Sequence, residues 1–460
     1  MDTKKLRQKI LDLAIRGKLV PQDPNDEPAS VLLERIRAEK ERLIKEGKIK
    51  RSKKSASDTP HYENRQVGEA NEVPFEVPES WEWTTINDIC SKIGSGSTPR
   101  GSNYAKEGIP FFRSQNVYND GLVYDDIKYI SEEVHENMIG TEVRAKDLLL
   151  NITGGSLGRC AIVPDEFQKG NVSQHVCILR TIIVLPAYLH LFIISDYFAA
   201  TMILSGSGRE GLPKYSLETM QFPLPPIEEQ KQIVAAVNKW FALIDTLETA
   251  KEDLQTSITL AKSKILDLAI HGKLVPQDPN DEPAIELLKR INPKFTPCDN
   301  AHYENVPEGW TVCALEDIID YEQPQAYIVQ STDYKSQYKT PVLTAGKSFI
   351  IGYTNELEGV FTDLPVIIFD DFTTDSKFVD FPFKVKSSAM KILHVKEEVN
   401  IQYVCWFMSI TRLIGDTHKR YWISEYSKLH IPIPPRKEQD RIINKVNELF
   451  QIIDNISAEL

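Results

Sequence analysis

Apolar residues recur at steps of three and four through one long stretch of the chain, residues 227–272. This spacing predicts a long helix that packs along a second helix. Two prolines precede the stretch at 225 and 226, and Gly272 ends it. At 1.5 Å per residue the helix would be roughly 70 Å long, which is typical of a spacer and too long for the core of one small domain. Lys251 interrupts the expected seam, whose members are Val237, Phe241, Ile244, Leu247, Leu254, Ile258, Ala261, Ile265 and Leu268.

Segments near the chain ends repeat the two halves of this helix. Residues 9–36 match residues 264–291 at an offset of 255, and only four of the 28 positions differ. FPLPPIEEQKQIVAAVNKWFALID, from Phe222, is echoed by IPIPPRKEQDRIINKVNELFQIID, from Ile431, at an offset of 209. The two terminal helices together would rebuild the central helix with four positions missing. Such repeats predict a circular, pseudo-twofold arrangement of two similar units, joined by an antiparallel coiled coil.

Between the helical segments the periodicity changes to that of strands. Short β-prone runs such as IPFFR, LLLNIT, CAIVP and VCILRTIIV alternate with turns rich in Gly, Asn and Ser, which predicts a sheet-rich domain. The opening VPESWEWTTINDI at Val77 is repeated as VPEGWTVCALEDI at Val306, so a second such domain is expected. The predicted fold class is therefore α+β, with two sheet-containing domains separated by the coiled coil. The expected divisions are an N-terminal helical region with a linker (1–59), a first domain (60–222), a central region with the long helix (223–301), a second domain (302–430) and a C-terminal helix (431–460).

Composition narrows the chemical class. The net charge of −12 does not favour nucleic acid as a default partner, although residues 45–54 form a strongly basic run. The six cysteines form no CxxC pair and the nine histidines no HExxH, which argues against structural zinc, a disulfide framework or any other metal site. No apolar run is long enough to span a bilayer, so no membrane association is expected. A reducing, cytoplasmic setting fits this composition.

Several glycine-rich stretches resemble parts of enzyme motifs without completing them. TPVLTAGKS, at residues 340–348, ends like a phosphate-binding P-loop, but Pro341 stands where that motif needs glycine. IGSGSTP and LLLNITGGSLGR do not complete the dinucleotide-binding pattern, and no GxSxG or amino-methyltransferase tetrapeptide occurs. A catalytic constellation is therefore not predicted, and we expect a protein without an active site of its own.

The loops do contain the residue types that contact DNA. Glycine allows close approach to a phosphate, Arg can pair with guanine, and Asn or Gln can pair with adenine in the major groove. Each loop alone is better explained as an ordinary polar loop than as a contact, and only the set of loops favours DNA. The candidate DNA-binding residues are Ser95, Ser97, Thr98, Arg100, Arg113, Gln115, Asn116, Thr153, Ser156, Arg159, Gln174, His175, Arg209 and Lys214 in the first domain, and Lys347, Thr373, Thr374, Lys377, Lys386, Lys419, Arg420 and Tyr421 in the second.

Along nearly its whole length the chain resembles the specificity subunit of type I restriction–modification systems. The resemblance is carried by the two KILDLAIxGKLVPQDPNDEPA blocks, the two PPxxEQ helix entries, the VPExW domain openings, and the loop signatures GSGSTP, LLLNITGGSLGR, NVSQHVCILR and TPVLTAGKS. It implies two target-recognition domains that each read one half of a bipartite site in double-stranded DNA, with the coiled coil setting the gap between the halves.

The resemblance also implies partners. Two methyltransferase subunits would bind S-adenosylmethionine and methylate adenine, and restriction subunits would use ATP and Mg²⁺, so no cofactor is expected in this chain. The PQDPNDEP loops and outer helix faces are candidate docking surfaces for the methyltransferase, although the loops are equally explained as helix-ending turns. Two other hypotheses stay open: an enzyme that uses the incomplete P-loop, and a coiled-coil scaffold whose two domains bind proteins.

Overall fold

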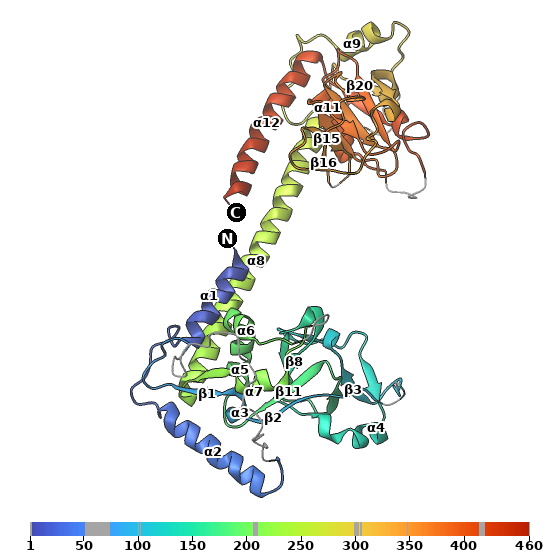
Figure 1. The fold of residues 1–460 in the computed structure, drawn as a ribbon. Helices are drawn as coiled ribbons and strands as arrows, with labels where there is room; N and C mark the ends of the chain where they lie inside the picture. The colour runs from blue at the N-terminus through green and yellow to red at the C-terminus, as the bar shows by residue number, and fades with distance from the viewer. Residues whose placement is uncertain are drawn as a thin grey trace. The chain divides into compact units, whose positions relative to one another are not determined.

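The computed structural model describes residues 2–50, 74–99, 101, 103–205, 210–298, 303, 306–346, 348–413 and 419–459. They form two compact units, Met1–Thr249 (unit 1) and Ala250–Leu460 (unit 2). Each unit combines helices with twisted sheets, so the predicted α+β class is confirmed (Figure 1). The candidates Arg100, Arg209 and Lys347 lie outside the described residues.

The described part of unit 1 contains two four-stranded sheets. One has the order β2-β11-β8-β9 and is antiparallel throughout. The other has the order β6-β3-β10-β7, in which β3 and β10 run parallel. Their strands are β2 (Cys90–Ser95), β3 (Ile109–Phe112), β6 (Lys128–Ile130), β7 (Glu142–Val143), β8 (Leu148–Asn151), β9 (Cys160–Ile162), β10 (Gly170–Val172) and β11 (Val176–Thr181). The apolar runs IPFFR, LLLNIT, CAIVP and VCILRT thus form strands, as their β-branched and aromatic content predicts.

Smaller elements surround these sheets. The strands β1 (Glu82–Thr85) and β12 (Gln221–Leu224) pair with each other, and β4 (Val117–Tyr118) pairs with β5 (Gly121–Leu122). The helices of unit 1 before the long helix are α1 (Thr3–Ile15), α2 (Ala29–Lys45), α3 (Ile86–Ile89), α4 (Glu132–Asn137), α5 (Pro186–Ile193), α6 (Asp196–Thr201) and α7 (Lys214–Thr219). Side chains from α1, α2, α5 and the β2 sheet share one apolar core.

Unit 2 repeats this plan, with three described strands instead of four in its second sheet. Its described strands form the sheets β14-β20-β17-β18 and β16-β15-β19, and β15 runs parallel to β19 as β3 does to β10. The strands are β13 (Thr311–Ala314), β14 (Ile319–Glu322), β15 (Thr340–Leu343), β16 (Ile350–Thr354), β17 (Val366–Asp370), β18 (Ser376–Val379), β19 (Lys384–Val385), β20 (Met390–Val395) and β21 (His430–Ile433). Its helices are α9 (Ala284–Ile291), α10 (Leu315–Ile318), α11 (Ile401–Ile410) and α12 (Arg436–Ala458).

The predicted long helix is α8, which runs from Ile227 to Ile270 without a break. In unit 1 its first part packs on α1, where Val237 and Ile244 are buried and Arg7 pairs with Glu248 at 2.9 Å. In unit 2 its last part packs on α12, where Lys262 pairs with Asp454. Figure 1 shows each terminal helix running beside α8 within its own unit.

The middle of α8 does not form the continuous seam that the sequence predicts. Leu247 is 50% exposed and Leu254 is 37% exposed, and Ala261 is exposed as well. All residues from 250 to 257 are exposed, because the terminal helices end before they can cover this segment. Residues 250–257 of α8 thus have no facing helix among the described residues.

A hydrogen-bonded latch explains why the motifs at the helix entries occur twice. In unit 1, Glu229 accepts hydrogen bonds from Trp81 Nε1 at 2.8 Å and from Gln22 Nε2 at 3.0 Å. These residues come from the VPExW opening, the PPxxEQ helix entry and the PQDPNDEP loop. The next residue, Gln230, accepts from Leu185 N and donates to Pro225 O. One buried cluster therefore joins four segments that are far apart in the sequence.

The same latch closes unit 2. Glu438 accepts from Trp310 Nε1 at 3.0 Å and from Gln277 Nε2 at 3.0 Å, and Gln439 accepts from Asn400 N at 2.7 Å. The glutamates are fully buried, with 1% exposure for Glu229 and 0% for Glu438. Burial raises the pKa of both carboxyl groups, against the effect of the two donors, which lower it.

Candidate nucleic-acid interface

The polar loops of unit 1 meet at one end of its sheets, although they are far apart along the chain. Strand β2 leads into residues 96–99, where Gly96 N donates to Val176 O and Ser97 N donates to Val172 O. A Cβ at Gly96 would overlap the Val172 carbonyl, so this close approach requires glycine. On the neighbouring sheet, Ser173 N donates to Phe112 O at 2.9 Å. These bonds bring together the segments after β2 and β3 and the segment before β11.

Two further loops join the same end. Asn151 Nδ2 donates to Ser114 O at 2.8 Å, which ties the loop after β8 to the loop after β3. Ile152 N donates to His175 O, and Leu212 N donates to Ile152 O at 2.8 Å. We call this set of five segments, residues 95–99, 113–116, 151–159, 173–175 and 210–214, the loop edge of unit 1. The structure thus gathers the described candidates of the first domain on one edge.

The side chains on this edge fall into two kinds. Exposed ones include Ser95, Ser97, Gln115 and Lys214, and Thr98 donates to the exposed Gln174. Thr153 Oγ1 lies 2.8 Å from His175 Nδ1, and these two half-buried groups also link neighbouring loops. The remaining half-buried candidates are Arg113, Ser156 and Arg159.

The two arginines of this edge have partners within the unit. Arg113 pairs with Asp126 at 3.1 Å, and Gln115 donates to the same carboxylate. The guanidinium of Arg159 lies 4.7 Å from the ring centroid of Tyr118, a cation–π arrangement. Neither Asp126 nor Tyr118 was singled out from the sequence, because nothing in their local pattern reveals a long-range partner.

Asn116 has a different role from the one expected of it. Its side chain is 0% exposed, accepts from Arg113 N and donates to Val123 O and Asp125 O. The carboxamide is fully used inside the loop, and a base edge has no access to it. We therefore assign Asn116 to shaping the loop and remove it from the candidate contacts.

Unit 2 has a matching loop edge, formed by residues 344–346, 348, 370–376, 386–389, 411–413 and 419–422. Lys386 N donates to Leu343 O, and Asp371 N donates to Ala389 O at 3.0 Å. Tyr421 N donates to Asp371 O at 2.9 Å, so the C-terminal loop joins the same edge. Of the candidates here, Thr373, Lys386, Lys419 and Arg420 are exposed, and Lys377 is exposed nearby on the outer strand β18.

Two candidates of unit 2 are buried. Thr374 is 0% exposed, and its hydroxyl accepts from Leu413 N at 3.2 Å. Tyr421 is 4% exposed and its ring packs in the core of the unit. Both side chains lie inside the unit and stabilise the loops that carry them, so we also remove them from the candidate contacts.

Strand order shows that the two edges are built alike. In the order β2-β11-β8-β9 and the order β14-β20-β17-β18, the loops that follow β8 and β17 are equivalent, as are those that precede β11 and β20. The parallel pairs β3–β10 and β15–β19 make the loops that follow β3 and β15 equivalent. The segments before β12 and β21 also correspond, because each of these strands pairs with the first strand of its unit. Described candidates chosen independently in two divergent domains thus lie at three of these equivalent positions, after β8 and β17, before β11 and β20, and before β12 and β21.

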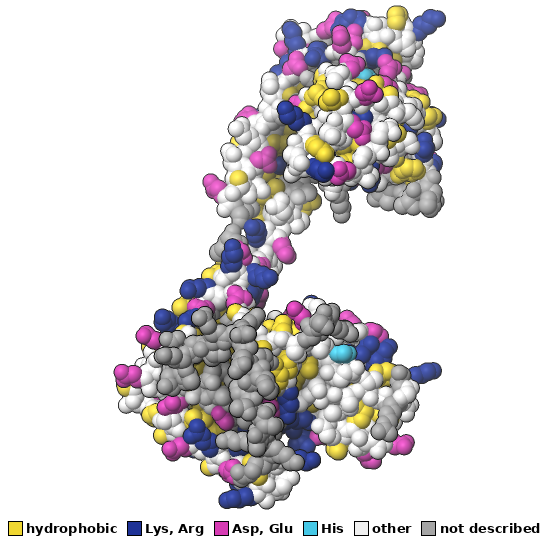
Figure 2. Space-filling model, viewed as in Figure 1, with side chains coloured by type: hydrophobic (Ala, Val, Ile, Leu, Met, Phe, Trp, Pro, Cys, Tyr) yellow, Lys and Arg dark blue, Asp and Glu magenta, His cyan; other side chains and the backbone are white. Residues whose placement is uncertain are grey.

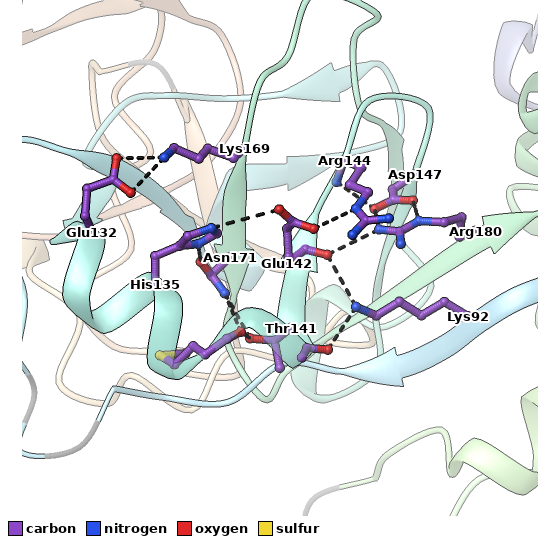
Figure 3. Close-up of polar contacts among 12 residues, drawn as sticks. Lys92, Glu132, His135, Thr141, Glu142, Arg144, Asp147, Lys169, Asn171 and Arg180 are labelled. Carbon is purple, nitrogen blue, oxygen red and sulfur yellow. Dashed lines mark hydrogen bonds and ion pairs between the residues drawn. The ribbon is translucent and has the colours of Figure 1, made fainter. Parts of the chain in front are cut away.

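The opposite end of the unit 1 sheets carries a polar network with a structural role (Figure 3). His135 Nδ1 lies 2.6 Å from Asn171 Oδ1, and Asn171 Nδ2 donates to Met138 O and Thr141 Oγ1. Asp147, which is 0% exposed, forms a two-point ion pair with Arg180. Lys92 Nζ donates to the carbonyls of Gly140 and Glu142, which joins one sheet to the other. Residues of these types also occur in catalytic sites, but here the hydrogen bonds and ion pairs of these side chains stabilise the two sheets and their connections.

Other chemistry is not supported in the described part of the chain. No group of three or more His, Cys, Asp or Glu among the described residues could hold a metal ion. Burial raises the pKa of Cys177 to about 12, so this thiol stays protonated at neutral pH. No helix among the described residues has the length and apolar content needed to cross a membrane.

The fold and the two loop edges define a class of protein: one in which two similar sheet-containing domains each present a set of polar loops and are joined by a long helix. A family model described as the type I restriction modification DNA specificity domain matches residues 78–256. The chain is 26% identical to the EcoAI specificity subunit of Escherichia coli, over 98% of this chain and 90% of that one. It is 31% identical to the Escherichia coli EcoEI specificity subunit over 69% of this chain, and spans 62% of that relative.

A solved structure supports the same fold. A chain from a study of complex assembly and conformational transition in a type I restriction–modification system superposes with a TM-score of 0.56, at 15% identity, over 84% of this chain and 94% of that one. The chain belongs to the family of type I restriction–modification specificity subunits. It is the DNA specificity subunit of such a complex. Members of this family supply recognition and are not catalytic. The resemblance drawn from the repeated motifs is confirmed.

Proposed function

We propose that each loop edge reads one half of a bipartite site in double-stranded DNA, with residues 60–222 and 302–430 as the two target-recognition domains. The observation that carries this proposal is the equivalence of the two edges. Two domains with the same strand order present polar loops at the same positions, yet the loop sequences differ. This is what a protein needs to apply one docking geometry to two different base sequences.

The exposed side chains suit groove contacts. Lys386, Lys419 and Arg420 in unit 2 and Lys214 in unit 1 can contact phosphates or guanine. Ser97, Thr98 and Gln174 in unit 1 offer hydroxyl and amide groups for base edges or sugars. The proposed contacts are the exposed and half-buried candidates that remain after Asn116, Thr374 and Tyr421 are removed.

Charge explains why the subunit would act within a complex. The chain has a net charge of −12, and on the face in Figure 2 the described basic and acidic side chains are interspersed over each unit. Counterion release from many phosphate contacts needs more positive charge than this. We infer that the methyltransferase subunits supply part of the phosphate contacts, and that DNA binding by the isolated subunit is weak.

The methyltransferase subunits would dock on an apolar stripe that occurs once in each unit. On α8 in unit 1, Leu243 is 47% exposed and Leu247 is 50% exposed. Their equivalents on α12 in unit 2, at the repeat offset of 209, are Ile452 at 51% and Ile456 at 49%. Trp240, also exposed, extends the stripe of unit 1. Apolar side chains at equivalent positions of two repeated helices suit two copies of one partner.

The partners would carry the chemistry. S-adenosylmethionine would bind to the methyltransferase subunits, which methylate adenine, and ATP and Mg²⁺ would bind to restriction subunits that join the complex. The chain itself would hold no cofactor, and the complex would work in the cytoplasm. Because a base must leave the duplex stack before methylation, the loop edges would hold the DNA while the partner extracts the adenine.

The test is to co-express the chain with its methyltransferase subunit and map methylated adenines across the host DNA. The expected result is one two-part motif with a fixed gap. In a variant chain, the exposed basic residues Lys386, Lys419 and Arg420 are replaced by Ala. The motif of this variant should lose or relax one half-site only, and the other half-site is the matched control. A folded and assembled complex that adds no methylation would contradict the proposal and favour a scaffold whose two domains bind proteins.

A further inference from the structure

Gln323 extends the loop edge of unit 2 at a position for which no candidate is predicted from the sequence. In unit 1, strand β2 ends at Ser95, which lies opposite Cys177 in the register of β2 with β11. In unit 2, Glu322 lies opposite Ile392, so the next residue, Gln323, reaches the level of Lys391. Whether Gln323 corresponds to Ser95 therefore depends on whether Lys391 in β20 is equivalent to Cys177 in β11.

The inner strands β11 and β20 also pair with β8 and β17, and these registers identify the equivalent residues of the two units. Val176 pairs with Asn151 at the end of β8, and Met390 pairs with Asp370 at the end of β17. Cys177 and Lys391, each one residue further on, are therefore equivalent. Gln323 takes the place that Ser95, a candidate contact, has in unit 1.

A buried lysine fixes the orientation of the Gln323 side chain. Lys391 is 1% exposed, and its Nζ donates to Gln323 Oε1 at 3.0 Å. The ammonium group has only donors, so the oxygen of the carboxamide must face it. The NH₂ end of the carboxamide then points away from the lysine, and Gln323 is exposed. A flexible glutamine is thus held with its donor end available.

The lysine is itself held in place by a buried acidic group. Its Nζ lies 3.3 Å from Oδ2 of Asp371, whose side chain is 3% exposed. Oδ1 of the same carboxylate accepts from Trp422 N at 2.8 Å. The pair Lys391–Asp371 therefore connects the segments after β14 and β17, the start of β20 and the C-terminal loop. Breaking such a buried pair is costly, so its geometry is well defined.

We propose that Gln323 is a specificity-determining residue of the second half-site and presents its amino group to a hydrogen-bond acceptor on a base edge. This inference rests on the proposed function, because it assumes that the loop edge of unit 2 faces the DNA. The acceptors in the major groove are N7 and O6 of guanine, N7 of adenine and O4 of thymine. The contact with Lys391 occupies one of the two lone pairs of the carboxamide oxygen, so the amino group is the end that is wholly available to a base.

The test is the substitution Gln323→Glu in the complete complex, followed by mapping of methylated adenines. One carboxylate oxygen would keep the contact with Lys391, and the other would present an acceptor where the parent chain presents a donor. Preference at one base pair of one half-site should then move towards a base with an amino group, cytosine or adenine. A good contact is worth roughly a tenfold to hundredfold preference, so the change would be visible in the motif.

Two more variants complete the experiment. Gln323→Ala should relax preference at the same base pair, and serves if the glutamate variant does not assemble. Gln337→Glu makes the same chemical change at another exposed glutamine of unit 2, before the start of β15 and away from the loop edge, and should leave the motif unchanged.

The outcomes separate the two levels of inference. If the parent complex yields a two-part motif and both Gln323 variants keep every base of it, the inference is overturned and the proposed function stands. If the parent complex yields no such motif, the proposed function fails and this inference fails with it. A change confined to one position of one half-site, absent from the Gln337 control, supports both.

Discussion

The side chain of Asn116 lies inside unit 1 and makes three hydrogen bonds to the backbone of its own loop. From the sequence, its place in FRSQN favours contact with a base, because Asn and Gln are the common readers of adenine. Composition identifies a polar loop, but not which of its side chains turn inward. That choice depends on the partners Val123 and Asp125, which only the folded loop brings near.

The substitution Asn116→Ala is expected to lower the free energy of unfolding by about 1–3 kcal/mol, since it leaves buried backbone groups without partners. Chemical denaturation with two-state analysis measures the change. The neighbouring Gln115→Ala is the matched control, because Gln115 is exposed and its side chain donates to the exposed carboxylate of Asp126. Equal effects of the two substitutions would show that the buried carboxamide does not brace the loop.

The latch glutamates Glu229 and Glu438 give the protein a dependence on pH. Burial raises the pKa of each above its ordinary value of 4.5, so the folded chain holds these protons more tightly than the unfolded chain. The stability contributed in this way is complete below pH 4.5 and is lost as the pH rises through the raised values.

The variants Glu229→Gln and Glu438→Gln have no such titration. Denaturation at about pH 5 and about pH 8 should therefore show that the free energy of unfolding of the parent chain, relative to that of either variant, is higher at the lower pH. Asp12→Asn in α1 is a control at a partly exposed carboxylate that pairs with Arg16. A difference that grows towards pH 8 would contradict the assigned direction of the pKa change.

At the scale of elements, helix boundaries follow from glycine and proline. The long helix is predicted over 227–272 and observed over Ile227–Ile270. Gly17 and Gly272 follow α1 and α8 with φ of +65° and +64°, values that favour glycine. The seam is where prediction failed, since Leu247, Leu254 and Ala261 are exposed. Periodicity shows that a face is apolar but not which other element covers it.

Gly272→Ala should destabilise unit 2 for two reasons: its φ is positive, and a Cβ there would overlap the ring of Pro307. We expect a loss of about 2–4 kcal/mol, from roughly 1 kcal/mol of backbone strain and the cost of the clash. Gly47→Ala is the control, because its φ is +71° but nothing lies within 4 Å of the new Cβ. Thermal unfolding compares the two, and equal losses would exclude the contact with Pro307 as a cause.

At the scale of the molecule, the repeated segments predict the architecture and the existence of two loop sets. They do not predict Lys391, Asp371 or Gln323, because a buried ion pair between distant strands leaves no local pattern. The repeat also marks the equivalent exposed side chains Leu243 and Ile452. The docking role proposed for them is testable, because a change in one unit leaves the equivalent surface of the other unit intact as a control.

Leu243→Asp and Ile452→Asp should each weaken the binding of one methyltransferase subunit, while the double variant weakens both. Burial of a leucine or isoleucine side chain stabilises an interface by about 1.5–3 kcal/mol, so each affinity should fall roughly tenfold or more. Mass measurement of the purified complex gives the stoichiometry. Full occupancy with the double variant at low concentration would place the docking surface elsewhere.

The length of α8 should set the distance between the two half-sites. Insertion of seven residues between Leu254 and Leu268, with a matching insertion in the terminal helices, should lengthen the gap of the methylated motif and leave both half-sites intact. Seven residues keep the apolar faces in register, whereas four or five would rotate them. Altered half-site bases would mean that the helix affects how the loop edges are formed.

The two latches use the same residue types, so the chain carries two sets of interchangeable partners: Gln22, Trp81 and Glu229 in one, Gln277, Trp310 and Glu438 in the other. Mixed pairs would satisfy the same hydrogen bonds and trap the chain in a wrong connection. The order of synthesis protects against this error. Glu229 leaves the ribosome 48 residues before Gln277, a delay of about 2–10 s at ordinary rates of translation. The first latch can close while its competitor does not yet exist.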